Sequence, residues 1–168
     1  MKIILADASR VDTVWALMQR CHQSLLRAGI AQWDDVYPTR AVPESDARRA
    51  ALYTLADGDA VVGCVTLDEV QAKEYATVPW RGGEPALVVH RLCVDPAVQG
   101  RGLSHQLMDF AEVHARRHGY ASIRLDAYSA NARSVTLYRK RGYREAGRLF
   151  LPRRPLPFHC FELLVGTE

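Results

Sequence analysis

Apolar residues recur every three or four positions in several stretches of the chain, which is the period of an amphipathic helix. The first stretch begins at Ser9, which with Asp12 resembles a capping box, and it ends at Gly29. The other expected helices are a short one over 43–51, one opened by residues 99–102 and ended by Gly119, and one over 132–140 ended by Gly142.

Runs of β-branched and apolar residues between turn residues predict strands. Residues 52–56 and 60–67 are separated by Asp57, Gly58 and Asp59, a hairpin signal. The remaining expected strands cover 86–94, 123–127 and two stretches of the tail around the prolines at 152, 155 and 157. This order predicts an α+β fold with a mixed central β-sheet flanked by helices, and the length of 168 residues predicts a single domain over 1–168.

Composition is that of a globular protein, with 48% hydrophobic and 24% charged residues, so disorder and coiled coil are excluded. The net charge of +3 is too small to indicate a nucleic acid partner. Residues 85–168 nevertheless carry 13 basic and 7 acidic side chains, which either form a solvated face or suit an anionic ligand. No apolar run is long enough for an export signal or a membrane span, so a cytoplasmic protein without a membrane partner is expected.

Cysteine spacing points to the same compartment. The four cysteines lie far apart in apolar stretches and form no CxxC pair. This pattern is typical of reduced core thiols and not of disulfides or zinc, and no metal site is expected. The cysteines are Cys21, Cys64, Cys93 and Cys160.

The clearest chemical signal is the glycine-rich turn between the strand 86–94 and the following helix. Gly100 and Gly102 allow a close approach of the backbone to a ligand, and the start of a helix favours a phosphate. The P-loop pattern does not match. A dinucleotide fingerprint needs glycine where His105 stands, although Asp126 imitates its ribose-binding acidic residue, so this class stays an alternative.

A third pattern, Q/R-x-x-G-x-G/A, fits the turn QGRGLS except that Ser104 replaces the last small residue. The strand sequence HRLCVDP precedes it, and Asn131, Tyr138, Gly142 and Tyr143 follow at separations typical of one family. Over about residues 86–145 the chain resembles the GNAT family of N-acetyltransferases, and the order of elements along the whole chain agrees with that fold.

The resemblance implies acetyl-CoA as the cosubstrate and a set of residues that bind it. Backbone groups of Leu92, Cys93 and Val94 would hold the pantetheine arm, and Asn131 would contact the arm or cap its helix. Backbone amides of the turn would bind the pyrophosphate, with Gln99 supporting the turn. These amides belong to Gly100, Arg101, Gly102, Leu103 and Ser104.

The resemblance also implies an acid and leaves the base open. Tyr138 matches the tyrosine that protonates the departing CoA thiolate, with packing against the sheet as its alternative role. Asp126 is the first candidate for the base, although an ion pair with Arg124 explains it equally well. Glu69 and His90 are the other candidates, and a water chain could replace all three.

We therefore expect an enzyme that transfers acetyl from acetyl-CoA to a primary amine of a small molecule or peptide, by direct attack in a ternary complex. One rival acetylates protein N-termini, as ribosomal-protein acetyltransferases do. The other is a non-catalytic acyl-CoA binding or regulatory module, which would need the turn but not Tyr138. Members of the family often pair, so the resemblance also allows a homodimer. Four loop aromatics would flank the acceptor mouth or pack the core: Trp33, Tyr37, Tyr75 and Trp80.

Overall fold

The structure is a computed structural model that describes residues 1–166. Its strands are β1 (Lys2–Leu5), β2 (Leu52–Asp57), β3 (Ala60–Asp68), β4 (Ala86–Val94), β5 (Ser122–Tyr128), β6 (Arg144–Leu149) and β7 (Phe158–Leu164). They form a mixed seven-stranded sheet with the order β1-β2-β3-β4-β5-β7-β6, which confirms the predicted fold class. The chain forms two compact units, each made of two segments. The first holds residues 1–67 and 89–111, and the second holds residues 68–88 and 112 onward. The single domain over 1–168 stays a prediction.

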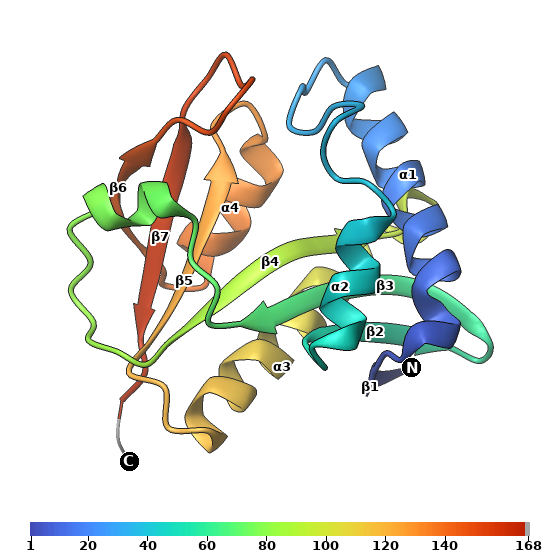
Figure 1. Ribbon diagram of the computed structural model, residues 1–168, viewed down its shortest axis with the longest axis horizontal. Helices are drawn as coiled ribbons and strands as arrows, with labels where there is room; N and C mark the ends of the chain where they lie inside the picture. Colours follow the sequence, from blue (N-terminus) through green and yellow to red (C-terminus); the bar gives the residue numbers. More distant parts are fainter. Residues whose placement is uncertain (167–168) are drawn as a thin grey trace. The chain divides into compact units, whose positions relative to one another are not determined.

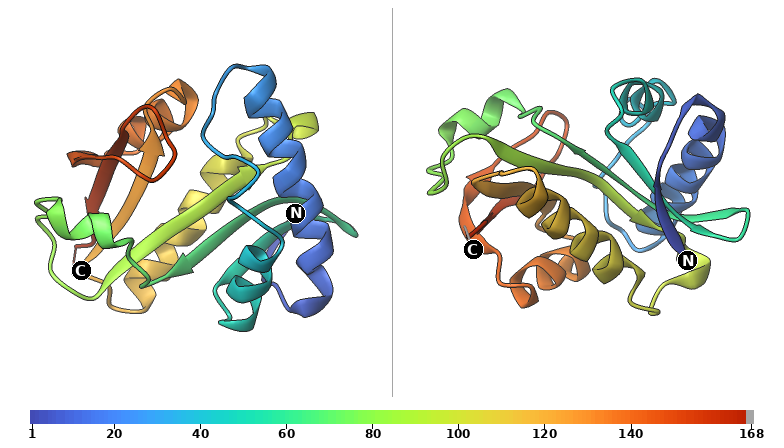
Figure 2. Two further views of the ribbon diagram at one scale, coloured as in Figure 1. Left: turned by 45° about the horizontal axis from the view of Figure 1, so that its top comes forward. Right: turned by 90° about the horizontal axis from the view of Figure 1, so that it is seen from below.

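The first unit combines antiparallel strands with two packed helices. Strand β2 pairs with both β1 and β3, and α1 lies beside α2 (Figure 1). Figure 2 shows α1 and α2 on one face of these strands and the first part of α3 on the other. The elements are β1 (Lys2–Leu5), η1 (Ala8–Arg10), α1 (Val11–Arg27), α2 (Ala41–Arg48), β2 (Leu52–Asp57), β3 (Ala60–Asp68), the later part of β4 (Ala86–Val94), η3 (Pro96–Val98) and the first part of α3 (Leu103–Arg117).

The core of this unit explains the helical spacing of α1. Val14, Leu17 and Met18 are fully buried, as the three-and-four spacing requires of one helix face. On β3, Gly63 allows close packing, because a Cβ there would lie 3.0 Å from the Cys93 carbonyl oxygen and 3.2 Å from Leu107. Buried side chains of α1 and of strands β2, β3 and β4 form one hydrophobic cluster.

The second unit is built around β7, which pairs antiparallel with β5 on one side and β6 on the other. The first residues of β4 pair parallel with β5. Figure 2 shows α4 and η2 on opposite faces of these strands, and this placement decides which side chains meet. The elements are η2 (Lys73–Thr77), β5 (Ser122–Tyr128), α4 (Ala132–Lys140), β6 (Arg144–Leu149) and β7 (Phe158–Leu164).

Two local predictions were wrong. The first strand, β1, was not expected, because four residues are too few to show a periodic pattern. The capping box at Ser9 does not form: Asp7 accepts hydrogen bonds from Ser9 and caps η1, and α1 begins without a side-chain cap. Within residues 1–166, no helix is long and apolar enough to cross a membrane.

Candidate functional site

The glycine turn of the first unit follows the end of β4 through a short, well-anchored segment. Asp95 caps η3 by accepting the Ala97 N–H at 3.0 Å, and it pairs with Arg20 at 2.6 Å. Burial alone would raise the pKa of Asp95, but these two contacts lower it, so the carboxylate stays ionised. The Gln99 amide donates to the Val94 carbonyl at 3.1 Å and ties the turn to the strand end.

The turn itself presents an open backbone at the start of a fifteen-residue helix. Gly100 and Gly102 have φ values of +85° and +75°, in the left-handed region that glycine adopts without strain. No atom lies within 4 Å of a Cβ built at either glycine, so the space in front of the backbone is free. The first N–H groups of a helix have no partner within the helix. The turn therefore fits a pyrophosphate group bound by backbone amides.

The strand before the turn carries the residues expected to hold the pantetheine arm. Leu92 and Val94 are half-buried, whereas Cys93 is only 4% exposed. Hydrogen bonds with the Cys21 and Cys64 thiols, together with burial, hold the pKa of the Cys93 thiol well above its usual value. Cys93 is therefore a protonated core thiol and not a nucleophile at neutral pH.

In the second unit, α4 presents the predicted acid. Tyr138 is 6% exposed, and its ring contacts those of Tyr143 and Phe161, each at 5.9 Å between centroids. Asn131 is the N-cap of α4, because its Oδ1 accepts the Ser134 N–H at 3.2 Å. The capping role expected for Asn131 is thus present, and it fixes the start of the helix that carries Tyr138.

A buried tyrosine holds the first candidate base. The Tyr75 hydroxyl of η2 donates to Asp126 Oδ2 on β5 at 2.7 Å. Tyr75 is 2% exposed, and its ring packs on Trp80 at 5.1 Å between centroids. Burial and the neighbouring Asp126 raise the pKa of Tyr75 well above its usual value, so the phenol stays a donor. Sequence analysis missed this pair, since 51 residues separate its members.

The alternative partner expected for Asp126 has other contacts. Arg124 pairs with Glu84 at 2.7 Å and with Glu162 at 3.5 Å, and its guanidinium lies over the Trp80 ring. Arg124 thus holds the loop before β4 against β5, while Asp126 accepts the Tyr75 hydroxyl.

The register of β5 and β7 places the candidate acid and base on opposite faces. Asp126 lies opposite Cys160, whereas Leu125 lies opposite Phe161. Successive side chains of a strand alternate between faces. Asp126 therefore shares the face of Cys160 and Tyr75, and Tyr138 packs on the other face through Phe161.

The two other candidate bases lie on or next to other elements. Glu69 follows β3, is exposed and accepts the Tyr120 hydroxyl at 3.0 Å. His90 is half-buried on β4 and belongs to the first unit. The second unit thus brings Asp126 together with Tyr75, and Glu69 has a different partner.

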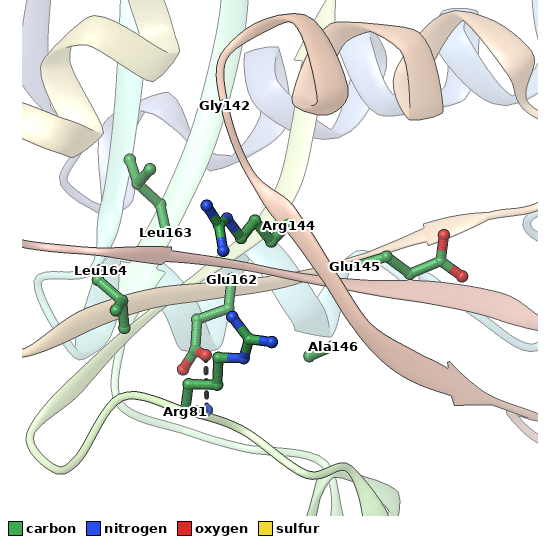
Figure 3. Close-up of a pocket in the computed structure, with 8 residues that line it drawn as sticks. All are labelled: Arg81, Gly142, Arg144, Glu145, Ala146, Glu162, Leu163 and Leu164. Atoms are coloured by element: carbon green, nitrogen blue, oxygen red, sulfur yellow. Dashed lines mark hydrogen bonds between the residues drawn. The ribbon is translucent and has the colours of Figure 1, made fainter.

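The second unit also has a pocket at the β6–β7 pair, where the Arg81 backbone N–H donates to Glu162 at 2.7 Å (Figure 3). Among the described residues, none of the predicted catalytic or cofactor residues lines it. The lining residues are Arg81, Gly142, Arg144, Glu145, Ala146, Glu162, Leu163 and Leu164.

Comparisons with known proteins agree with this geometry. The sequence profile of the Acetyltransferase (GNAT) family matches residues 13–143. No curated protein matches the chain in sequence. Because the profile covers most of the chain, the protein belongs to the GNAT acetyltransferase family.

Solved structures show the same fold at low sequence identity. A GNAT family acetyltransferase from Streptococcus agalactiae has a TM-score of 0.82 at 18% identity, over 99% of this chain and 96% of that one. The yncA protein of Salmonella typhimurium, solved with its cofactor acetyl-CoA, has a TM-score of 0.72 at 19% identity, over 100% and 95%. The ribosomal-protein-S18-alanine N-acetyltransferase of Escherichia coli has a TM-score of 0.71 at 14% identity, over 99% and 95%.

Proposed function

We propose that the protein is an N-acetyltransferase that moves the acetyl group of acetyl-CoA to a primary amine of a small molecule or peptide. The observation that carries this proposal is the open turn before α3, in which Gly100 and Gly102 are both left-handed. We assign the pyrophosphate to the backbone amides of 100–104, supported by Gln99, and the pantetheine arm to the backbone of 92–94. The solved acetyl-CoA complex of the yncA protein supports this choice of cosubstrate.

Acetyl-CoA supplies a thioester as the acetyl donor, and the residues of this chain position it and move protons. In the proposed reaction a backbone N–H of residues 92–94 polarises the thioester carbonyl. Tyr138 Oη gives a proton to the departing thiolate. Asp126, which accepts the Tyr75 hydroxyl at 2.7 Å on the other face of β5 from Tyr138, is the first candidate to take a proton from the attacking amine. Glu69, His90 and a water chain are the alternatives. The burial of Cys93, which is 4% exposed, supports direct transfer without an acetyl-cysteine.

An acetyl-CoA turnover screen tests the proposal. The purified chain is offered amines, amino acids, polyamines, aminoglycosides and peptides, and release of free CoA is measured. We expect release that depends on one class of amine. Release with peptides alone would identify a protein N-terminal acetyltransferase. Tight CoA binding without turnover on any acceptor would contradict the proposal and indicate a binding module.

The proposal includes a cytoplasmic location and allows a homodimer. All four cysteines are free and buried, which supports a reducing compartment. Sedimentation of the purified chain would measure the oligomeric state.

A further inference from the structure

A buried ion pair in the first unit joins α2 to β4. Asp46 of α2 is 2% exposed, and its Oδ2 lies 2.7 Å from Arg91 Nη2 and 2.9 Å from Arg91 Nε. The same oxygen accepts the Thr66 hydroxyl at 2.8 Å, and Oδ1 accepts Arg49 at 2.7 Å. Removing one member of a buried ion pair leaves an uncompensated charge. The Asp46 and Arg91 side chains are therefore held in contact with one another.

Each nitrogen of the Arg91 guanidinium has a partner. Its Nη1 donates to the Tyr37 hydroxyl at 2.9 Å, while its other nitrogens face Asp46. Burial alone would lower the pKa of Arg91, but the contacts with Tyr37 and Asp46 raise it, so the guanidinium remains charged. These contacts tie the Arg91 side chain to α2 and to the loop that carries Tyr37.

The backbone of Arg91 is unusual for a strand. Its φ is +50°, and among the described residues it is the one non-glycine residue inside a strand with a positive φ. A side chain disfavours this region, and such a conformation persists where surrounding contacts impose it. The burial pattern of β4 changes at the same place, since the four buried residues 86–89 are followed by three half-buried ones.

This left-handed residue lies immediately before the segment to which the proposed function assigns the pantetheine arm. We propose that the Asp46–Arg91 ion pair is a positioning device for that segment: it holds the left-handed backbone at Arg91 and thereby sets the direction of the Leu92–Val94 backbone that binds acetyl-CoA. The inference rests on the proposed function and adds two residues to it. Neither residue touches the reacting atoms. Both act through the backbone of β4.

The experiment measures CoA affinity by calorimetry, KM for acetyl-CoA, and Tm. Asp46→Asn and Arg91→Ala should each raise the Kd for CoA and the KM for acetyl-CoA by roughly tenfold or more, because small misplacements of binding groups are costly. Arg91→Gly also removes the guanidinium, but glycine adopts a positive φ freely, so it should keep more CoA affinity than Arg91→Ala. Arg91→Lys retains the charge and should lie between the wild type and Arg91→Ala.

The matched control is Val14→Ala, which truncates a fully buried side chain of α1 in the same unit and should lower Tm while leaving Asp46 and Arg91 in place. It should leave the Kd for CoA unchanged at temperatures below its Tm. Equal Kd values for wild type and Asp46→Asn, equal losses in Arg91→Gly and Arg91→Ala, or an equal loss in Val14→Ala would each overturn the positioning role. A wild-type chain that binds no CoA would overturn the proposed function and this inference together. A chain that binds CoA but acetylates nothing overturns the reaction alone.

Discussion

Tyr138 combines a packing role with the proposed proton transfer, and removing its hydroxyl tests the two roles separately. Tyr138→Phe keeps the ring contacts with Tyr143 and Phe161. If the hydroxyl is the acid, turnover should fall by roughly 10² to 10⁴ while CoA affinity stays constant. Tyr143→Phe is the matched control, since it deletes a hydroxyl from a neighbouring ring. Unchanged turnover in Tyr138→Phe would reduce Tyr138 to a packing residue.

Tyr75 should tune the candidate base through its 2.7 Å hydrogen bond to Asp126. A hydrogen bond to a carboxylate stabilises the ionised form, so Tyr75→Phe should move the acidic limb of the kcat/KM profile to higher pH. Asp126→Asn should abolish that limb, and higher pH should partly restore turnover by deprotonating the amine in solution. If Glu69→Gln or His90→Gln is rescued in this way instead, the base is one of those residues. An unchanged profile in Tyr75→Phe would show that Asp126 does not titrate in the reaction.

At the scale of elements, the turn before α3 depends on the backbone conformation of its glycines. Gly102 has a φ of +75°, and the space around it is open, so strain and not a clash with the protein opposes a side chain. Gly102→Val should abolish CoA binding in calorimetry because it displaces the amides and covers them. Gly119→Ala is the control, since Gly119 ends α3 with a φ of +73° and open space. It should lower Tm but preserve CoA affinity. CoA binding by Gly102→Val at wild-type affinity would remove the turn from the site.

The β6–β7 pair contains an ion cluster that should govern stability in acid. Burial alone would raise the pKa of Glu145, but hydrogen bonds from His159, Arg148 and Arg139 lower it to about 2. A carboxyl whose pKa is depressed by folding stabilises the native state above its unfolded pKa of about 4.3 and loses this effect as pH falls toward 2. Glu145→Gln should therefore lower Tm at neutral pH by a few degrees, roughly 2–4 °C for each 1 kcal/mol.

The difference in Tm between the wild type and Glu145→Gln should close between about pH 4 and pH 2, as followed by calorimetry. The exposed pair of Asp12 and Arg40 provides the control, since Asp12→Asn should change Tm very little at any pH. A constant difference in acid would mean that the glutamate contributes through packing.

For the whole molecule, ligand binding links the site to global stability. A ligand that binds only the folded state stabilises it by about 2.7 kcal/mol at a hundredfold excess over its Kd. Acetyl-CoA should thus raise Tm by roughly 5–10 °C, and NAD should leave it unchanged. A Tm raised by NAD and not by acetyl-CoA would assign the turn to dinucleotide binding.

Local sequence was sufficient for most elements and for the turn. The helical spacing of Val11, Val14 and Met18 predicted α1, and their burial matches it. Gly100 and Gly102 predicted a turn whose backbone a ligand can approach closely, and both glycines have a positive φ that glycine adopts without strain. These features depend on neighbours within a few positions, so a single sequence contains the information for them. The four-residue strand β1 was not predicted, because its pairing with β2 stabilises it and its own sequence shows no strand pattern.

The contacts among distant side chains came only with the tertiary structure. Tyr75 meets Asp126 across 51 residues because η2 packs on the face of β5 that carries Asp126. Arg91 meets Asp46 across 45 residues because α2 packs near the part of β4 where Arg91 has a positive φ. No glycine marks this position in the sequence. Which distant side chains meet depends on which faces of the elements pack together, and the local patterns of a single sequence do not show this packing. The sequence alone identified the residues with suitable chemistry, whereas only the tertiary structure determined which of them contact one another.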